Sequence, residues 1–145
     1  MEVVSIKIRY TTNEIDRIKQ ADLGDWIDLR LAQDVHLEPN EFKLLSLGVA
    51  MKLPSDYEAL VIPRSSTFKN YGILMANSIG LIDESSCGNG DIWKFTAYAT
   101  RKVYIPKNTR ICQFRILKHQ PYIMFTDVLE LSGKDRGGFG STGKK

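Results

Sequence analysis

The sequence is poor in the residues that build metal and disulfide frameworks, with two cysteines and two histidines among its 145 residues. Cys87 and Cys112 belong to no CxxC motif and to no Cys/His cluster, which argues against a zinc site. Two cysteines without a secretion signal indicate free thiols in a reducing cytoplasm. Cys112 is expected to be a small core residue. His36 and His119 share no motif and are interpreted as structural or surface residues.

Long hydrophobic runs are also missing. A membrane-spanning helix needs roughly 20 apolar residues, and runs such as 59–62 are far shorter. The N-terminus alternates apolar and polar residues, unlike the continuous apolar run of a signal peptide. We therefore expect neither a membrane span nor a signal peptide. The net charge of +3 is mildly basic and does not by itself predict nucleic-acid binding.

Short alternating segments indicate β-strands throughout a chain whose length suits one domain. Turn clusters rich in Gly, Pro, Asn and Asp separate them. The pattern predicts an all-β protein, a distorted jelly-roll β-sandwich. A short helix is predicted at 65–71, capped by Ser65 or Ser66 and ended by Gly72, and another at 13–21. The predicted strands are 4–10, 27–31, 42–53 (one or two strands, bent at Gly48), 93–99, 111–117 and 122–131.

The end of the chain has a different composition. Residues 133–144 hold five glycines and one aromatic residue, Phe139. Such a segment cannot bury a core and should be mobile when empty. We predict a domain over 1–132 followed by a flexible glycine-rich arm over 133–145. A solvated tail is the plain alternative, although a purely solvating tail has little use for Phe139.

Three segments have features suited to binding or processing anions. Residues 63–67 place Arg64 and hydroxyl groups at the start of a short helix, where free N–H groups attract anions. An ordinary capped helix with a surface arginine is the alternative. Residues 80–83 bring Asp83 to a strand end, where an aspartate can also simply shape a turn. The glycine-rich arm adds backbone amides, hydroxyls and cationic side chains that could surround phosphates.

Taken together and in this order, the segments resemble the motifs of trimeric dUTPases, from about Val3 to Thr142. The sequence around these motifs is most similar to that of bacteriophage and prophage members of the family. The five matching segments are Asp28-Leu29, 63–66, 80–83 with Gly88, 109–114 and 137–143. The resemblance implies hydrolysis of dUTP to dUMP and pyrophosphate, which limits uracil incorporation into DNA and supplies dUMP for thymidylate synthesis. It also implies a homotrimer in the (host) cytoplasm. Each of its three sites would lie at subunit interfaces under the arm of a neighbouring chain.

The same resemblance implies a role for each matching residue. Asp83 would be the general base that activates the attacking water. Asn77 would bind uracil, Phe139 would stack on it, and Ser86 would lie at the deoxyribose. One Mg²⁺ would be held by substrate phosphates and waters, with no direct protein ligand and with Asp28 reaching it through water. The implied phosphate-binding residues are Arg64, Ser65, Ser66, Gln113, Arg136, Ser141 and Thr142.

The chain departs from the family pattern at three places. Ser86 stands where the family usually has a tyrosine that packs under the deoxyribose. Lys134 occupies the slot of the family's arm arginine, and we expect Arg136 to serve instead. Trp26 replaces a small residue before Asp28 and puts the role of that aspartate in doubt. Two alternatives stay open: a dCTP deaminase of the same fold, and a catalytically weakened regulatory protein that binds a repressor.

Overall fold

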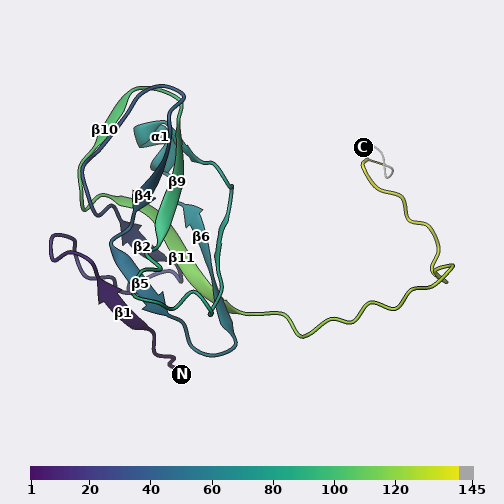
Figure 1. Ribbon diagram of the computed structural model, residues 1–145. Coiled ribbons are helices and arrows are strands. Elements are labelled where there is room, and N and C mark those ends of the chain that lie inside the picture. The colour runs from purple at the N-terminus through teal and green to yellow at the C-terminus, as the bar shows by residue number, and fades with distance from the viewer. Residues whose placement is uncertain (141–145) are drawn as a thin grey trace.

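A computed structural model of the chain describes residues 1–140 (Figure 1). Within them are eleven strands and one short helix, so the predicted all-β class with a single well-formed helix is confirmed. The elements are β1 Lys7–Tyr10, β2 Ile27–Arg30, β3 Val35–Leu37, β4 Phe42–Ser46, β5 Val49–Lys52, β6 Tyr57–Pro63, α1 Thr67–Tyr71, β7 Ile73–Met75, β8 Gly80–Ile82, β9 Lys94–Ala99, β10 Val103–Ile105 and β11 Arg110–Lys118.

The strands pair antiparallel in four small sheets. A four-stranded sheet has the order β2-β11-β6-β8, and a three-stranded sheet has the order β4-β9-β7. Two further pairs, β1-β5 and β10-β3, complete the fold. Alternation along β6, β7 and β9 sends every second side chain inward, so both larger sheets contribute to one hydrophobic core. The predicted strands within 4–10, 27–31, 93–99 and 111–117 are therefore confirmed, with small shifts at their ends.

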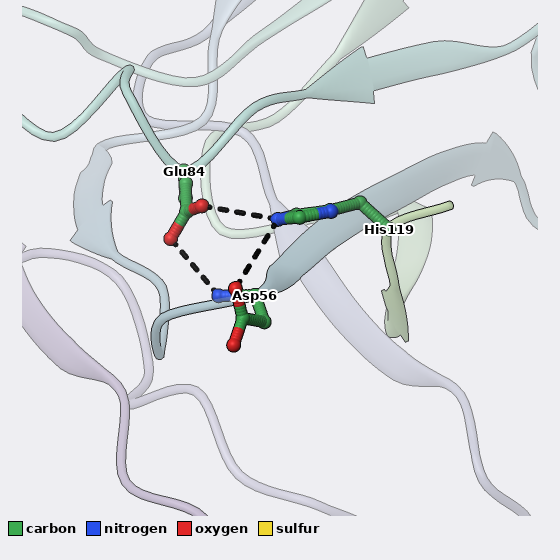
Figure 2. A group of neighbouring side chains, drawn as sticks. All are labelled: Asp56, Glu84 and His119. Atoms are coloured by element: carbon green, nitrogen blue, oxygen red, sulfur yellow. Dashed lines mark hydrogen bonds and ion pairs between the residues drawn. The ribbon is translucent and has the colours of Figure 1, made fainter. Parts of the chain in front are cut away.

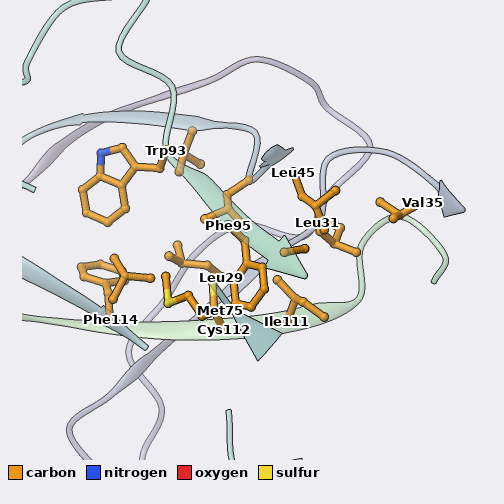
Figure 3. Packing of buried hydrophobic residues seen from close by; sticks show 14 of the residues in the cluster. Leu29, Leu31, Val35, Leu45, Met75, Trp93, Phe95, Ile111, Cys112 and Phe114 are labelled. Carbon is orange, nitrogen blue, oxygen red and sulfur yellow. The ribbon is translucent and has the colours of Figure 1, made fainter. Parts of the chain in front are cut away.

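The core holds large side chains from both sheets (Figure 3). Trp93 packs edge-on against Phe114, with ring centroids 5.1 Å apart. Phe95 is fully buried nearby, and so is Cys112 on β11. The expectation that Cys112 is a core residue is confirmed, and burial raises the pKa of its thiol far above the usual range.

Gly48 divides the predicted strand 42–53 into two. It adopts a positive φ of 72°, which L-residues with a side chain rarely tolerate. The chain turns there, so that β4 joins the three-stranded sheet while β5 pairs with β1. The predicted bend at Gly48 is confirmed.

The predicted helix at 13–21 is wrong. Its backbone is irregular because tertiary partners take the N–H groups that a helix would use. The Asp16 N–H donates to Asn108 Oδ1 at 2.8 Å, and the Ile18 N–H donates to the Tyr10 hydroxyl at 2.7 Å. Ile15 is nevertheless buried. The apolar pattern therefore predicted the burial of this residue correctly but predicted the wrong backbone conformation.

The predicted strand at 122–131 is also wrong for this chain by itself. After β11, residues 119–140 form no helix or strand and run away from the body (Figure 1). A strand needs a partner for its backbone groups, and this segment pairs with none of the described strands. Large apolar side chains consequently stand in solvent: Tyr122, Met124, Phe125, Val128, Leu129 and Leu131. The boundary at residue 132 between domain and arm stays a prediction.

Within residues 1–140, no helix has the length and hydrophobicity that crossing a membrane requires.

Gly48 offers a test of the fold. A Cβ at this position would lie 3.0 Å from Ile15 Cδ1 and 3.2 Å from Ala32 Cβ. We expect Gly48→Ala to lower the free energy of unfolding by about 2 kcal/mol, from positive-φ strain and overpacking. The measurement is urea unfolding at fixed protein concentration. Gly90→Ala is the control, because its Cβ would meet nothing within 4 Å. Equal losses in the two variants would contradict this account.

Candidate active site

Four polar side chains gather where β6 ends. The Asp28 carboxylate lies between two arginines, with Oδ1 3.2 Å from Arg64 Nε and Oδ2 3.4 Å from Arg110 Nη1. Gln113 is the direct cross-strand partner of Asp28 and donates from Nε2 to the Pro63 carbonyl at 3.2 Å. We call Asp28, Arg64, Arg110 and Gln113 the arginine cluster. Sequence reasoning identified three of its members but gave Arg110 no role.

The loop that carries Arg64 is held by a residue that the sequence analysis missed. Thr67 is 1% exposed, and its hydroxyl donates to the Ile111 carbonyl at 2.7 Å. The same oxygen accepts the Arg64 N–H at 3.0 Å. This hydroxyl therefore ties the arginine loop to β11.

The cap prediction for α1 needs correction at one end. Ser66 occupies the N-cap position, but its side chain makes no capping hydrogen bond, and Ser65 precedes the cap. The Thr67 hydroxyl binds the loop backbone instead. At the other end the prediction is confirmed, because Gly72 adopts φ 65° and its N–H donates to the Phe68 carbonyl.

Asp83 begins a tight turn directly after β8. Its Oδ1 accepts the Ser85 N–H at 2.8 Å, and its carbonyl accepts the Ser86 N–H at 3.0 Å. The hydrogen bonds from Ser85 lower the pKa of the Asp83 carboxyl below its usual range, with a smaller effect from the positive charge of His119. Asp83 is exposed and ionised at neutral pH, so it can accept a proton from a bound water.

A pocket of about 270 Å³ adjoins this turn. Asn77 and Ser86 both line it, together with the buried Trp93. The Asn77 side-chain carbonyl accepts a hydrogen bond from the Thr96 hydroxyl on β9, which fixes its orientation. The structure thus brings together two residues predicted to contact the nucleoside. The strands that flank Asn77, β7 and β8, belong to different sheets.

A third group lies at the same end of the sheet and was not found from sequence. His119, just after β11, has Nε2 3.2 Å from Glu84 Oε1 and 3.6 Å from Asp56 Oδ1 (Figure 2). The interpretation of His119 as a structural or surface residue agrees with this position, although the sequence did not indicate its partners. The three residues are far apart in the chain, and no local pattern connects them.

The strand register separates the arginine cluster from Asp83. On β6, Ala59 pairs with Ile82, which places Asp83 beside Glu58. Arg64 is six residues further along the same chain direction, or about 20 Å at the usual rise per strand residue. Arg136 and Phe139 belong to residues 119–140, the segment that runs away from the body (Figure 1). Ser141 and Thr142 lie outside the described residues.

Thr67 provides a test of how the arginine loop is built. Thr67→Val leaves the Arg64 N–H and the Ile111 carbonyl without their partner, so we expect a loss of about 1–3 kcal/mol in the free energy of unfolding. Thr67→Ser keeps the hydroxyl and should retain most of the stability. Chemical denaturation of both variants measures the difference. Equal stability of Thr67→Val and wild type would show that the loop does not depend on this hydroxyl.

Comparisons with known proteins identify the family. Residues 16–143 match the dUTPase family. The SPbeta prophage-derived deoxyuridine 5′-triphosphate nucleotidohydrolase of Bacillus subtilis is 54% identical over 142 residues, which cover 98% of this chain and 100% of that protein. The deoxyuridine 5′-triphosphate nucleotidohydrolase of a Thermoanaerobacter species is 35% identical, over 77% of this chain and 75% of that protein.

The solved structure of the Staphylococcus bacteriophage 80alpha dUTPase with dUPNHPP has the same fold, with a TM-score of 0.78 at 18% identity. The alignment covers 97% of this chain and 99% of that one. The sequence relatives are much closer than this structure, and they carry the family assignment. The chain therefore belongs to the dUTPase family and hydrolyses dUTP to dUMP and pyrophosphate.

Proposed function

We propose that dUTP hydrolysis takes place at a site shared between copies of this chain, with Asp83 from one copy and the arginine cluster from another. The separation of these groups along β6 carries this proposal. A general base must lie within hydrogen-bonding reach of the water it activates. About 20 Å of strand therefore prevents one chain from supplying both groups to the same α-phosphate.

The exposed C-terminal segment supports an oligomer, which we propose to be a homotrimer. Phe125 is 91% exposed and Leu129 is fully exposed, an unfavourable state for large apolar side chains. Packing residues 122–131 onto a neighbouring subunit would bury them. It would also carry the arm into a neighbour's site, where Phe139 would stack on uracil. Arg136 would bind phosphate there, with Ser141 and Thr142 beyond it.

The arginine cluster has the charge and geometry to bind a triphosphate. Two arginines share a single carboxylate, so the cluster keeps a net positive charge. Guanidinium groups bind phosphate oxygens in bidentate fashion, and Gln113 adds an amide donor. We propose that Arg64, Ser65, Ser66 and Gln113 hold the phosphates. Positive charge here stabilises the pyrophosphate as it leaves.

The donor set fits a magnesium ion that arrives with the substrate. Both oxygens of Asp28 already face arginines, so the cluster lacks the free carboxylates of a protein-held Mg²⁺ site. Mg²⁺ commonly keeps several waters and binds mainly through substrate phosphates. Asp28 would contact it through water. When bound, the ion would offset triphosphate charge.

Asp83 would orient a water and take its proton as the water oxygen attacks the α-phosphorus. The bond from the α-phosphorus to the bridging oxygen then breaks, and pyrophosphate leaves. Without substrate and with the arm away from the site, the lowered pKa of Asp83 makes its carboxylate a weak base. The nearby charge of the triphosphate and exclusion of water by the arm would raise that pKa toward the range in which a base works well.

Removal of the base tests this mechanism. We expect Asp83→Asn to reduce pyrophosphate release from dUTP by roughly 10²–10⁴-fold, because general-base assistance is lost. Binding of dUTP, measured by calorimetry, should persist because the arginine cluster is unchanged. Wild-type turnover in Asp83→Asn would contradict the assignment. A parallel ammonia assay with dCTP tests the deaminase alternative, and we expect no ammonia.

Ser86 governs the second prediction about activity. In the family a tyrosine usually fills this position, whereas the serine leaves space in the pocket beside Asn77. We expect Ser86→Tyr to increase the preference for dUTP over UTP by ~10–100-fold, the effect of restoring one aromatic contact. The ratio of kcat/KM values for the two nucleotides measures it. An unchanged ratio together with unchanged dUTP turnover would show that the residue at position 86 does not control the discrimination between deoxyribose and ribose.

A repressor-type protein partner is a secondary proposal. A structure of the Staphylococcus bacteriophage 80alpha dUTPase, 17% identical, is described with the statement that phage dUTPases control transfer of virulence genes. That statement concerns those proteins. In this chain Asp83, Asn77, Gln113 and Phe139 occur together, and a protein that only bound a repressor would have no need of that set. Any such role would accompany catalysis.

A further inference from the structure

Asp56, Glu84 and His119 form a small polar group, the clasp, that joins three segments (Figure 2). Glu84 follows Asp83 in the turn after β8, Asp56 lies in the turn before β6, and His119 follows β11. Glu84 bridges the other two, since Oε2 accepts the Asp56 N–H at 3.1 Å and Oε1 lies 3.2 Å from His119 Nε2. The backbone N–H of His119 donates to the backbone carbonyl of Asp56 at 3.1 Å.

The surroundings of His119 favour its charged form. Nδ1 lies 3.3 Å from the Gln120 carbonyl and Nε2 lies 3.2 Å from Glu84, so both ring nitrogens face acceptors. Only an imidazolium donates from both nitrogens at once. The Gln120 carbonyl and then Glu84 raise the pKa of His119. The charged groups that face it are Glu84 and Asp83 from one turn and Asp56 from the other.

We propose that Glu84 and His119 are positioning residues for Asp83. The proposal rests on the assignment of Asp83 as the base. Asp83 and Glu84 are the first two residues of one tight turn, so the contacts of Glu84 hold the backbone from which the Asp83 side chain extends. Apart from these contacts, the Asp83 carboxylate is held by the Ser85 N–H at an exposed site. Displacing a catalytic group by about 1 Å can cost ~10²-fold in rate.

The clasp also fixes the start of the segment that leads to the arm. His119 is the first residue after β11, and residues beyond it leave the body (Figure 1). Its backbone N–H binds the Asp56 carbonyl in the turn before β6, and its ring lies against Glu84 in the turn that carries Asp83. The same three residues therefore hold both the turn that carries Asp83 and the start of the segment that leads to the arm.

The effect of pH follows from the raised pKa of His119. The charged His119 ring stabilises the folded clasp fully at any pH below about 6.5, the pKa of histidine in the unfolded chain. This stabilisation is lost as pH rises through the higher pKa that His119 has in the folded protein. Positioning of Asp83 should therefore weaken over that interval, and kcat should fall with it.

The first test is an NMR titration of the full-length protein. The sequence contains two histidines, so His36 serves as an internal control. We expect the His119 ring to titrate above the usual histidine value of about 6.5 in wild type and to shift down in Glu84→Gln. An identical His119 midpoint in Glu84→Gln would overturn the proposal. A shift of the His119 resonance that is complete after one equivalent of Zn²⁺ would overturn it too, because Asp56, Glu84 and His119 would then be metal ligands.

The second test is kinetic. We expect Glu84→Gln and His119→Gln to lower kcat for dUTP by about 10-fold with little change in KM, since the base is misplaced and the phosphate contacts are intact. His119→Gln should also lose the fall in kcat that we expect of wild type as pH rises through the His119 pKa. Glu38→Gln is the matched control, an exposed carboxylate on another turn with a 4.0 Å contact to Lys102.

The outcomes separate this proposal from the mechanism on which it rests. An inactive Asp83→Asn beside a fully active Glu84→Gln with a wild-type pH profile overturns the role of the clasp alone. An active Asp83→Asn overturns the assignment of the base, and the positioning role falls with it. Loss of kcat in Glu84→Gln together with the downward shift of His119 supports the proposal.

Discussion

The pairing of β6 with β11 on one side and β8 on the other determines where the arginine cluster, Asp83 and the clasp lie. β6 contributes the buried residues Ala59 and Val61 to the core, so its register is fixed by hydrophobic burial. A slip of one residue would turn these side chains to the opposite face. The strand is seven residues long, and its length sets the spacing between the two functional regions.

The two ends of this strand have opposite chemical character. The end at Pro63 meets Asp28, Arg110 and Gln113 of β2 and β11, which gives it a net positive charge. The other end gathers carboxylates: Asp83 and the clasp at the turn, and Asp91 in the adjoining pocket. Carboxylates repel a triphosphate, so the nucleoside end of dUTP suits one chain and the phosphate end suits another. This division of charge gives an electrostatic reason for a site built from several copies.

Local patterns in the sequence were sufficient for part of the fold. Alternation predicted the strands that became β1, β2, β4, β5, β9 and β11, whereas β3, β6, β7 and β10 were not predicted. The bend at Gly48 and the end of α1 at Gly72 were predictable because glycine favours the positive φ that both positions adopt. The segment 122–131 has an equally good strand pattern, yet it forms no strand here, because a strand also needs a partner that alternation cannot supply. At 13–21 the apolar spacing was informative, but contacts from Tyr10 and Asn108 decided the backbone.

The grouping of the candidate residues was predictable where a sequence motif supplies them and unpredictable where tertiary contacts bring them together. Asn77 and Ser86 meet in one pocket, and Arg64, Asp28 and Gln113 meet at one strand end. Arg110, Thr67 and the clasp were missed because their importance depends on neighbours that lie distant in sequence. Thr67 acts through a carbonyl of β11, and His119 acts through residues of two other turns.

The central claim is that Asp83 and the arginine cluster act on one substrate only from different chains. Asp83→Asn and Arg64→Ala chains, each inactive alone, can be denatured together, refolded as a mixture and assayed for pyrophosphate release from dUTP. Random assembly of equal amounts should restore about a quarter of the sites, because such a site takes its intact base from one parent and its intact arginine from the other. Activity no higher than that of the separate parents, in mixed oligomers verified by mass, would place both groups in a single chain and contradict the account.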